Sequence, residues 1–224
     1  MFERFLQNAR KPQGIDGKLF VAAINSGHSG VSLWGLRHLD VNPEDSILDI
    51  GCGGGINVAR MLRRTSAGRV CGLDYSDVGV AKSASLNRKA IRVGRTEMRL
   101  GGVSRIPWAD NSFDAVTAFE TVYFWDHFAN DLQEVRRVLK PDGLFFVCNE
   151  MNKPEQGETS GQYWIKTLGL TMYGPAEFQA SLTAAGCVGP KPPKARGASA
   201  SAPVRKKHKE KRYDEYKKID GFVG

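Results

Sequence analysis

The chain has 224 residues, a length that suits one α/β domain with a substantial buried core. Its formal net charge is +8, but the charge is uneven along the chain. Residues 188–224 hold eleven Lys and Arg against four Asp and Glu, a net of +7, whereas residues 1–187 hold 21 against 20, a net of +1. The almost neutral body argues against a domain built around a nucleic acid, and the tail is expected to be a solvated, disordered extension.

No run approaches the ~20 apolar residues that cross a bilayer, so we expect no membrane span. The four cysteines show no paired metal spacing, and three of them fall in or beside predicted strands (Cys52, Cys71, Cys148 and Cys187). A buried thiol behaves as a small hydrophobe, which predicts a reduced, cytoplasmic protein without a metal site.

The pattern along the chain predicts a doubly wound α/β fold. Residues 1–45 carry helical patterns at 19–25 and 31–39, with a polar loop at 25–30 between them. From residue 46, apolar strands and helices alternate: strands at 46–50, 69–73, 96–100, 113–117 and 144–149, and helices at 56–64, 76–87 and 128–139. Such alternation implies a mostly parallel sheet with helices on both faces.

The sequence after the fifth strand changes character. Residues 150–174 are predicted to be a polar connection, followed by a helix from Pro175 to about Ala185 that ends at Gly186. From residue 188 the chain is rich in Pro, Ala, Ser and Lys and shows no alternating apolar strand. We therefore expect N-terminal helices over residues 1–45, a domain over 46–187 and a basic tail over 188–224.

A glycine-rich turn follows the first strand. Residues 47–55 read Ile-Leu-Asp-Ile-Gly-Cys-Gly-Gly-Gly, and residues 72–76 read Gly-Leu-Asp-Tyr-Ser. Glycines let the backbone approach a ligand closely, and Asp74 at the end of the second strand can accept hydrogen bonds from ribose hydroxyls. Ile56 replaces the third glycine of the dinucleotide fingerprint, so the pattern indicates a nucleoside crevice of a different kind.

Four stretches in order resemble the motifs of class I S-adenosylmethionine-dependent methyltransferases, at residues 47–55, 72–76, 106–116 and 138–145. The small-molecule subgroup that includes the ubiquinone and menaquinone biosynthesis methyltransferases is the most similar. The resemblance implies a Rossmann-like fold, S-adenosyl-L-methionine as the cofactor, and N-terminal helices that form a lid over the crevice. The family's closing strand pair has no counterpart in the tail.

The resemblance implies roles for the residues at the strand ends. Asp74 would accept from the ribose hydroxyls and Tyr75 would cover the adenine, while the glycine turn would approach the methionine part. Asp49 would fix the turn and reach the cofactor's ammonium, although Asp49 and Asp74 could instead cap helices. The cofactor-binding set is therefore expected to comprise Asp49, Gly51, Cys52, Gly53, Gly55, Asp74, Tyr75, Gly102, Val103, Phe119 and Glu120.

One part of the family pattern is missing. Many relatives have a Gly-Asp pair after the third strand whose acid receives the adenine amine, and this chain has Gly101-Gly102 followed by Val103. Adenine recognition would then depend on the backbone at Gly102 and Val103, with Ser104 as a further candidate.

The acceptor pocket is expected where the fourth strand ends, because ligands of open α/β sheets bind outside the carboxyl ends of the strands. Tyr123, Trp125 and His127 follow this strand, with Glu120 before them. His127 is the candidate base, since its unperturbed pKa is ~6.5. The predicted catalytic residues are His127, Tyr123 and Glu120, and Asn149 and Glu150 after the fifth strand are further pocket candidates.

The sequence favours methyl transfer to a small-molecule acceptor. An RNA or protein methyltransferase recruited by the basic tail, through RNA or an anionic surface, is an alternative. A cofactor-binding protein without catalytic activity is another. The acceptor and the oligomeric state are not encoded in any motif that we recognise.

Overall fold

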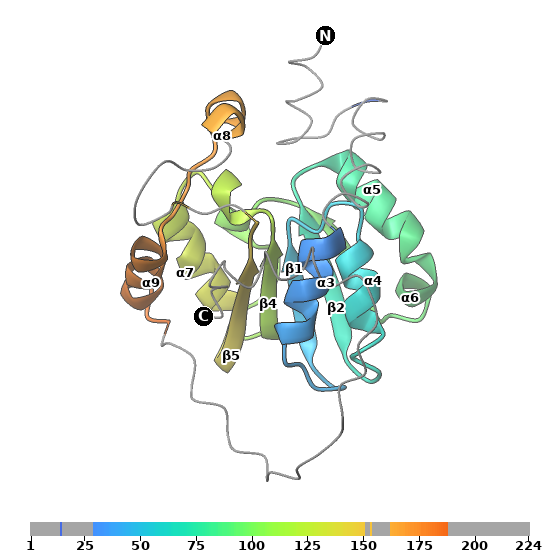
Figure 1. Cartoon of the computed structure of the whole chain (residues 1–224). Helices are drawn as coiled ribbons and strands as arrows, with labels where there is room; N and C mark the ends of the chain where they lie inside the picture. Colours follow the sequence, from blue (N-terminus) through green and yellow to red (C-terminus); the bar gives the residue numbers. More distant parts are fainter. Residues whose placement is uncertain (1–13, 15–28, 151–152, 154–161, 188–224) are drawn as a thin grey trace, which may run out of the picture.

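A computed structural model describes residues 29–150 and 162–187, together with Gly14 and Lys153 (Figure 1). The predicted helix at 19–25, most of the loop at 25–30 and the tail at 188–224 lie outside the described residues. Helix α3 (Ser29–His38) confirms the second predicted helix and begins two residues earlier than expected.

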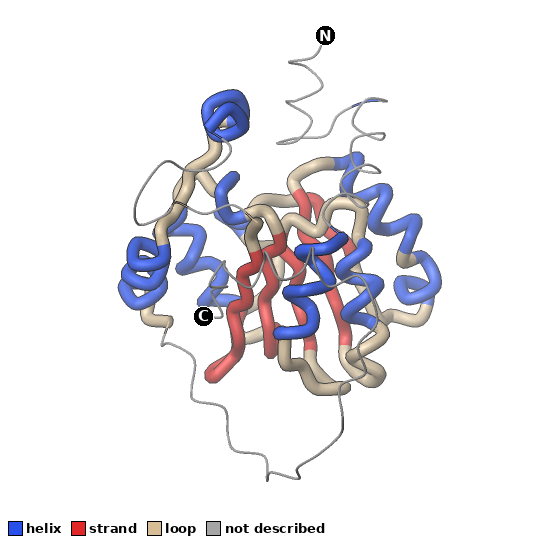
Figure 2. Tube along the Cα trace, viewed as in Figure 1, coloured by secondary structure: helices blue, strands red, loops and turns tan. Residues whose placement is uncertain are grey.

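The fold is a five-stranded parallel sheet in the order β3-β2-β1-β4-β5 (Figure 2). The strands are β1 (Ser46–Ile50), β2 (Arg69–Asp74), β3 (Met98–Leu100), β4 (Phe113–Phe119) and β5 (Leu139–Cys148). The chain moves outward from β1 to β3 and then crosses back to β4 on the other side of β1. Because the strand order reverses between β1 and β4, the carboxyl ends of these two strands flank the position where such sheets bind ligands.

Helices cover both faces of the sheet, which confirms the doubly wound prediction (Figure 1). The α-helices are α4 (Ile56–Leu62), α5 (Asp77–Leu86), α6 (Arg88–Arg92), α7 (Phe128–Val138), α8 (Gln162–Leu168) and α9 (Pro175–Ala184), and η1 (Val103–Arg105) and η2 (Val122–Phe124) are short 3-10 helices. None of the helices within the described residues is long and apolar enough to cross a membrane.

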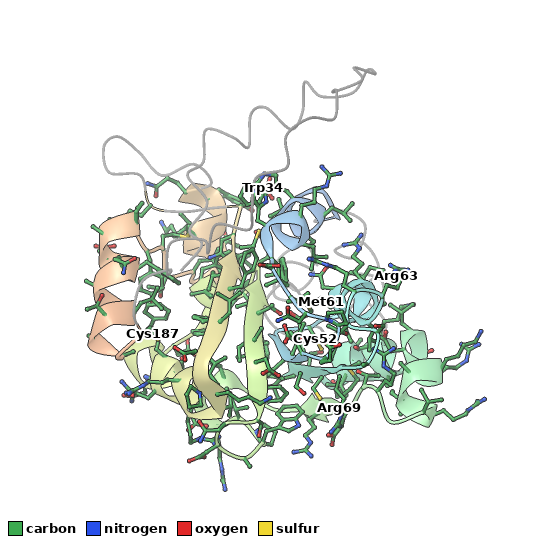
Figure 3. The ribbon with its side chains drawn as sticks, turned by 90° about the horizontal axis from the view of Figure 1, so that it is seen from below. Trp34, Cys52, Met61, Arg63, Arg69 and Cys187 are labelled. Atoms are coloured by element: carbon green, nitrogen blue, oxygen red, sulfur yellow. The ribbon has the colours of Figure 1, made fainter. Side chains whose placement is uncertain are left out.

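The core consists of two apolar clusters, one on each face of the sheet. In β4, Val116 and Ala118 belong to the cluster that includes α7 and α9, whereas Ala115 and Phe119 belong to the cluster that includes α3 and α4. Figure 3 shows Met61 of α4 packed toward the sheet. Both sides of each central strand are buried, which explains why these strands are almost continuously apolar.

Three features of the fold differ from the predictions by more than one or two residues at the end of an element. Strand β5 begins at Leu139, five residues before its predicted start, because residues 140–143, which separate the predicted helix and strand, form a bulge within the strand. In this bulge Asp142 has a φ of 63°, and the register shifts opposite Phe113–Ala115. The connection predicted over residues 150–174 was wrong in part, since it contains α8. The helix predicted at 76–87 ends at Leu86 and is followed directly by α6.

Helix ends follow the predicted residues closely. The Ser76 side chain accepts a hydrogen bond from the backbone N–H of Gly79 and so caps α5. At the end of α9, Gly186 has a φ of 80°, its N–H donates to the carbonyl of Thr183, and the N–H of Cys187 donates to the carbonyl of Leu182. This pair of bonds is a Schellman motif, and it confirms Gly186 as the helix stop.

Arg137 of α7 anchors the loop that leads into β4. Its guanidinium donates to the carbonyls of Ile106 and Trp108 and forms ion pairs with Asp110 and Glu134. Arg137 thus helps to hold the stretch at 106–116, which resembles a family motif, against α7, together with Glu134, whose carboxylate accepts from the N–H of Ile106 at 2.9 Å.

Candidate active site

The glycine turn after β1 is tied to the neighbouring strand. The N–H groups of Gly51 and Cys52 both donate to the carbonyl of Leu73 in β2, at 2.8 and 3.1 Å. Gly51, Gly53 and Gly55 have φ values of 70°, 50° and 77°, in the left-handed region that favours glycine. The turn therefore has a fixed course across the carboxyl ends of β1 and β2.

Two of these glycines differ in what surrounds them. A Cβ at Gly55 would lie 2.1 Å from Ser83 Oγ and 2.7 Å from Asn87 Nδ2, whereas a Cβ at Gly53 would meet no atom of the described residues within 4 Å. Gly55 is thus required for packing against α5. Within the part of the chain that the structure describes, nothing covers the backbone at Gly53, so a ligand could approach it there.

Asp74 stands at the end of β2 and faces this turn. It is 7% exposed, and its Oδ2 accepts from the N–H of Gly53 at 2.7 Å while its Oδ1 accepts from the N–H of Ser76 at 2.9 Å. Burial raises the pKa of Asp74, and the two backbone hydrogen bonds oppose that rise. Each carboxylate oxygen can accept a second hydrogen bond, so the group can still receive ribose hydroxyls.

Asp49 lies in the middle of the sheet, one strand away. It is 2% exposed, and the hydroxyl of Thr117 in β4 donates to its Oδ1 at 2.7 Å. Burial raises the pKa of Asp49 to about 7, helped by the negative charge of Asp74 and opposed by the Thr117 hydrogen bond. Helix α4 has no side-chain cap, so Asp49 does not act as its cap here. A cationic ligand group nearby would favour its ionised form.

The other predicted cofactor residues have mixed surroundings. Cys52 is buried, its Sγ lies 3.9 Å from Ser83 Oγ, and burial raises the pKa of the thiol, so it lines the turn as a neutral group. Tyr75 is 36% exposed beside Asp74. A Cβ at Gly102 would meet no atom of the described residues within 4 Å, whereas the side chain of Val103 is buried in η1. Tyr75 and Gly102 are thus exposed, whereas Val103 belongs to the apolar core, and the contacts of all three with the cofactor stay predictions.

The structure assigns Ser104 a different partner from the one expected. Its hydroxyl donates to Oδ1 of Asp131 in α7 at 2.6 Å, and Asp131 is completely buried. The carboxylate of Asp131 also accepts from the N–H of His127 at 3.3 Å. Ser104 therefore joins η1 to α7, and its oxygen can still accept a hydrogen bond, so the contact with adenine stays a prediction.

Two of the three predicted catalytic residues lie together after β4. The hydroxyl of Tyr123 donates to Oε2 of Glu120 at 2.8 Å, and the N–H of Glu150 donates to Oε1 of Glu120. Burial and the negative charges of Glu120 and Glu150 raise the pKa of Tyr123 well above its usual range. Tyr123 is thus a neutral phenol that orients Glu120, whose backbone has a φ of 55°.

The remaining predicted pocket residues differ in how far their side chains are buried. His127 is exposed at the start of α7. Phe119 packs on Phe146, with 5.8 Å between the ring centroids, in the apolar cluster that includes α3. Trp125 stacks on Phe145, with 6.1 Å between the ring centroids, in the cluster on the other face of the sheet. Trp125 is therefore packed in the core, and its place in an acceptor pocket stays a prediction. The buried Oδ1 of Asn149 has no hydrogen-bond partner among the described residues.

Several supporting residues were missed from the sequence. Thr117 holds Asp49, Thr121 lies against Gly51, and Ser83 and Asn87 lie against Gly55. The Asn87 amide donates to the carbonyl of Gly55 at 3.1 Å. A polar residue inside an otherwise apolar strand, as Thr117 is, was the available signal. No group of three or more His, Cys, Asp or Glu in the described part of the chain is placed to hold a metal ion.

A parallel sheet in this strand order, with a glycine turn after β1 and an acid at the end of β2, defines a Rossmann-like domain. Residues 48–147 match the methyltransferase domain family. This part of the chain is therefore a methyltransferase domain of the class I, S-adenosylmethionine-dependent kind.

Curated relatives agree with this assignment. The chain is 32% identical over 111 residues to sterol 24-C-methyltransferase ERG6B of Gibberella zeae, and the matched stretch covers 50% of this chain and 29% of that protein. It is 30% identical over 121 residues to putative methyltransferase YrhH of Bacillus subtilis, and here the matched stretch covers 54% of this chain and 66% of that protein. The chain thus spans under a third of the sterol enzyme.

Among solved structures, the [4+2]-cyclase SpnF is similar, with 28% identity, a TM-score of 0.59 and coverage of 69% of this chain and 56% of that chain. A protein named for a cyclisation therefore shares this architecture. The fold by itself does not fix the reaction.

Proposed function

We propose that the chain is an S-adenosylmethionine-dependent methyltransferase that transfers the methyl group in line to a small-molecule acceptor. The observation that carries the proposal is the position of Asp74, a buried acid that accepts a hydrogen bond from the backbone N–H of Gly53. Both residues lie within the part of the chain that matches the methyltransferase domain family, and within the described residues the backbone at Gly53 is uncovered. The similarity to a sterol methyltransferase supports a small-molecule acceptor. A cytoplasmic location stays a prediction.

The residues of the crevice suit the parts of this cofactor. Asp74 would accept from the ribose hydroxyls, and the open backbone at Gly53 leaves room beside it. Asp49, buried and with a raised pKa, would gain a favourable partner in an ammonium group. Tyr75 would cover the adenine, with the backbone at Gly102 along its edge.

When bound, S-adenosylmethionine supplies an electrophilic methyl group that needs placement more than activation. Positioning of the acceptor behind that methyl can supply much of the rate acceleration. Tyr123 and Glu120 would form the wall that orients the acceptor, because their hydrogen bond fixes both side chains at the end of β4. His127 would serve as the base that removes a proton from the acceptor.

Calorimetric titration with S-adenosylhomocysteine tests the cofactor site. Replacing Asp74 by Asn keeps the volume but removes the charge, and it should weaken binding about 10- to 100-fold, since hydrogen bonds to charged groups contribute about 1.5–3 kcal/mol. The matched control is Asp77→Asn, which changes an exposed acid three residues along in the first turn of α5. Equal affinity for both variants would refute the ribose role of Asp74.

The acceptor side needs a separate experiment. Tyr123→Phe removes only the hydroxyl that donates to Glu120, so it should lower kcat and leave the affinity for S-adenosylhomocysteine unchanged. Transfer of radioactive methyl groups to a library of lipids and metabolites, compared with RNA and protein, identifies the acceptor class. Labelling of RNA alone, lost on removal of residues 188–224, would favour the tail-recruited alternative, and absence of transfer despite cofactor binding would favour the cofactor-binding alternative.

A further inference from the structure

Exposed aliphatic side chains gather in one short segment at the edge of the domain. Leu86 at the end of α5 is 46% exposed, Ile91 in α6 is 37% exposed and Val93 just after α6 is 68% exposed. They account for three of the seven large hydrophobic side chains that are exposed among the described residues. Their clustering within eight residues distinguishes them from single exposed apolar residues, which are common on proteins.

Basic side chains alternate with these apolar ones. Arg88, Lys89 and Arg92 are exposed, and within the described residues none of the three forms an ion pair. The sequence from residue 78 to residue 96 contains no Asp or Glu at all. The positive charge of this segment is thus not neutralised by its own neighbours along the chain.

The same side of the molecule carries further positive charge. The guanidinium of Arg95, two residues beyond Val93, donates to the carbonyls of Leu62, Thr65 and Gly68, so the end of α6 is fastened to the loop between α4 and β2. That loop carries the exposed Arg63, which Figure 3 shows on the same side of the molecule as α6. The basic surface therefore extends from α6 onto this loop.

We propose that the α6 patch, formed by Leu86, Arg88, Lys89, Ile91, Arg92 and Val93, docks on an anionic lipid surface. Lysine and arginine at such a surface are attracted by its negative potential, and aliphatic side chains between them can enter the boundary between head groups and acyl chains. A nucleic acid would complement only the charges, since proteins that bind single strands use aromatic side chains to stack on bases and the patch has none.

The patch stands apart from the cofactor crevice. Helix α5 starts beside Asp74 at the carboxyl edge of the sheet and runs away from it, and α6 follows at the outer edge of the molecule (Figure 1). Changes in the α6 patch should therefore leave cofactor binding unaltered. The proposal can succeed or fail independently of the reaction that the domain catalyses.

Sedimentation of the full chain with vesicles tests the proposal. We expect binding to vesicles of phosphatidylcholine with phosphatidylserine, and weak or no binding to phosphatidylcholine alone. The triple change Arg88→Gln, Lys89→Gln and Arg92→Gln should lower the apparent partition coefficient about 100-fold, since each basic residue contributes about fivefold at an anionic surface. The matched control removes three exposed charges from η1, α7 and α8: Arg105→Gln, Arg136→Gln and Lys166→Gln. Equal losses in the two triple variants would overturn the proposal, because they would show an effect of net charge alone.

A second measurement separates lipid from nucleic acid. In Val93→Trp, the new indole should be quenched by lipids brominated on their acyl chains, whereas in the control Tyr163→Trp, an exposed site on α8, it should not. Both are compared with the quenching of the four native tryptophans. Absence of extra quenching at position 93, or binding to an RNA oligonucleotide that depends on the α6 patch while vesicle binding does not, would overturn the lipid assignment.

Discussion

Replacement of Gly55 by alanine should destabilise the domain strongly. Gly55 has a φ of 77°, and a Cβ there would lie 2.1 Å from Ser83 Oγ, 2.8 Å from Ser83 Cβ and 2.7 Å from Asn87 Nδ2. The left-handed backbone costs a non-glycine residue about 1–2 kcal/mol. Forcing a methyl group into a packed site costs about 1–3 kcal/mol more. The free energy of unfolding should therefore fall by about 2–5 kcal/mol.

The control for this variant is Gly53→Ala in the same turn. Gly53 has a φ of 50° but open space around its Cβ position, so only the backbone cost of about 1–2 kcal/mol applies. Urea denaturation followed by circular dichroism measures both, and Gly55→Ala should also melt several degrees below Gly53→Ala, since about 1 kcal/mol shifts Tm by 2–4 °C at this size. Gly53→Ala should instead lose affinity for S-adenosylhomocysteine. Equal stability of the two variants would refute the packing role of Gly55.

Two further predictions concern charged groups. The pKa of Asp49 rises from 3.8 to about 7 on folding, so the folded chain retains a proton that the unfolded chain loses between about pH 4 and pH 7. The free energy of unfolding should therefore fall as pH rises through that window. Above pH 7, Asp49→Asn should be more stable than the wild type by up to about 4 kcal/mol in denaturant titrations. The same dependence of unfolding free energy on pH in both proteins would contradict this. Arg137→Gln should lower the unfolding free energy by about 1–3 kcal/mol, because it frees the carbonyls of Ile106 and Trp108 and the Glu134 carboxylate, whereas Arg105→Gln should change it little. A loss as large for Arg105→Gln would refute the anchoring role of Arg137.

The order of strands and helices could be predicted because both faces of the sheet are buried. Apolar runs separated by helical patterns leave few alternatives to a parallel sheet, and Gly186 and Ser76 supplied clear helix ends. Strand β5 was predicted too short because Pro141 and Gly143 normally break a strand, and here they lie in its bulge. Local sequence does not show whether such a break leaves the sheet or bends within it.

The candidate site was predictable in its backbone but not in its side-chain partners. The glycine spacing and Asp74 follow from the close approach that a ligand needs, whereas the hydroxyl of Thr117 reaches Asp49 only because β4 happens to pair with β1 in that register. Likewise, Ser104 points to Asp131, 27 residues along the chain, and nothing near either residue indicates that contact. Long-range polar pairs are decided by packing, so the sequence cannot assign them one residue at a time.

Net charge gave a misleading account of the body of the chain. Residues 1–187 sum to +1, yet residues 56–96 hold nine basic side chains and two acidic ones, a net of +7, which leaves −6 for the rest. One of the two acids, Asp74, is buried and cannot neutralise the surface. The structure gathers much of this excess around α6 and the loop after α4, so a sum that suggested a neutral body concealed a polarised one. A strong field at one side of a molecule steers it toward anionic partners even where the total charge is small.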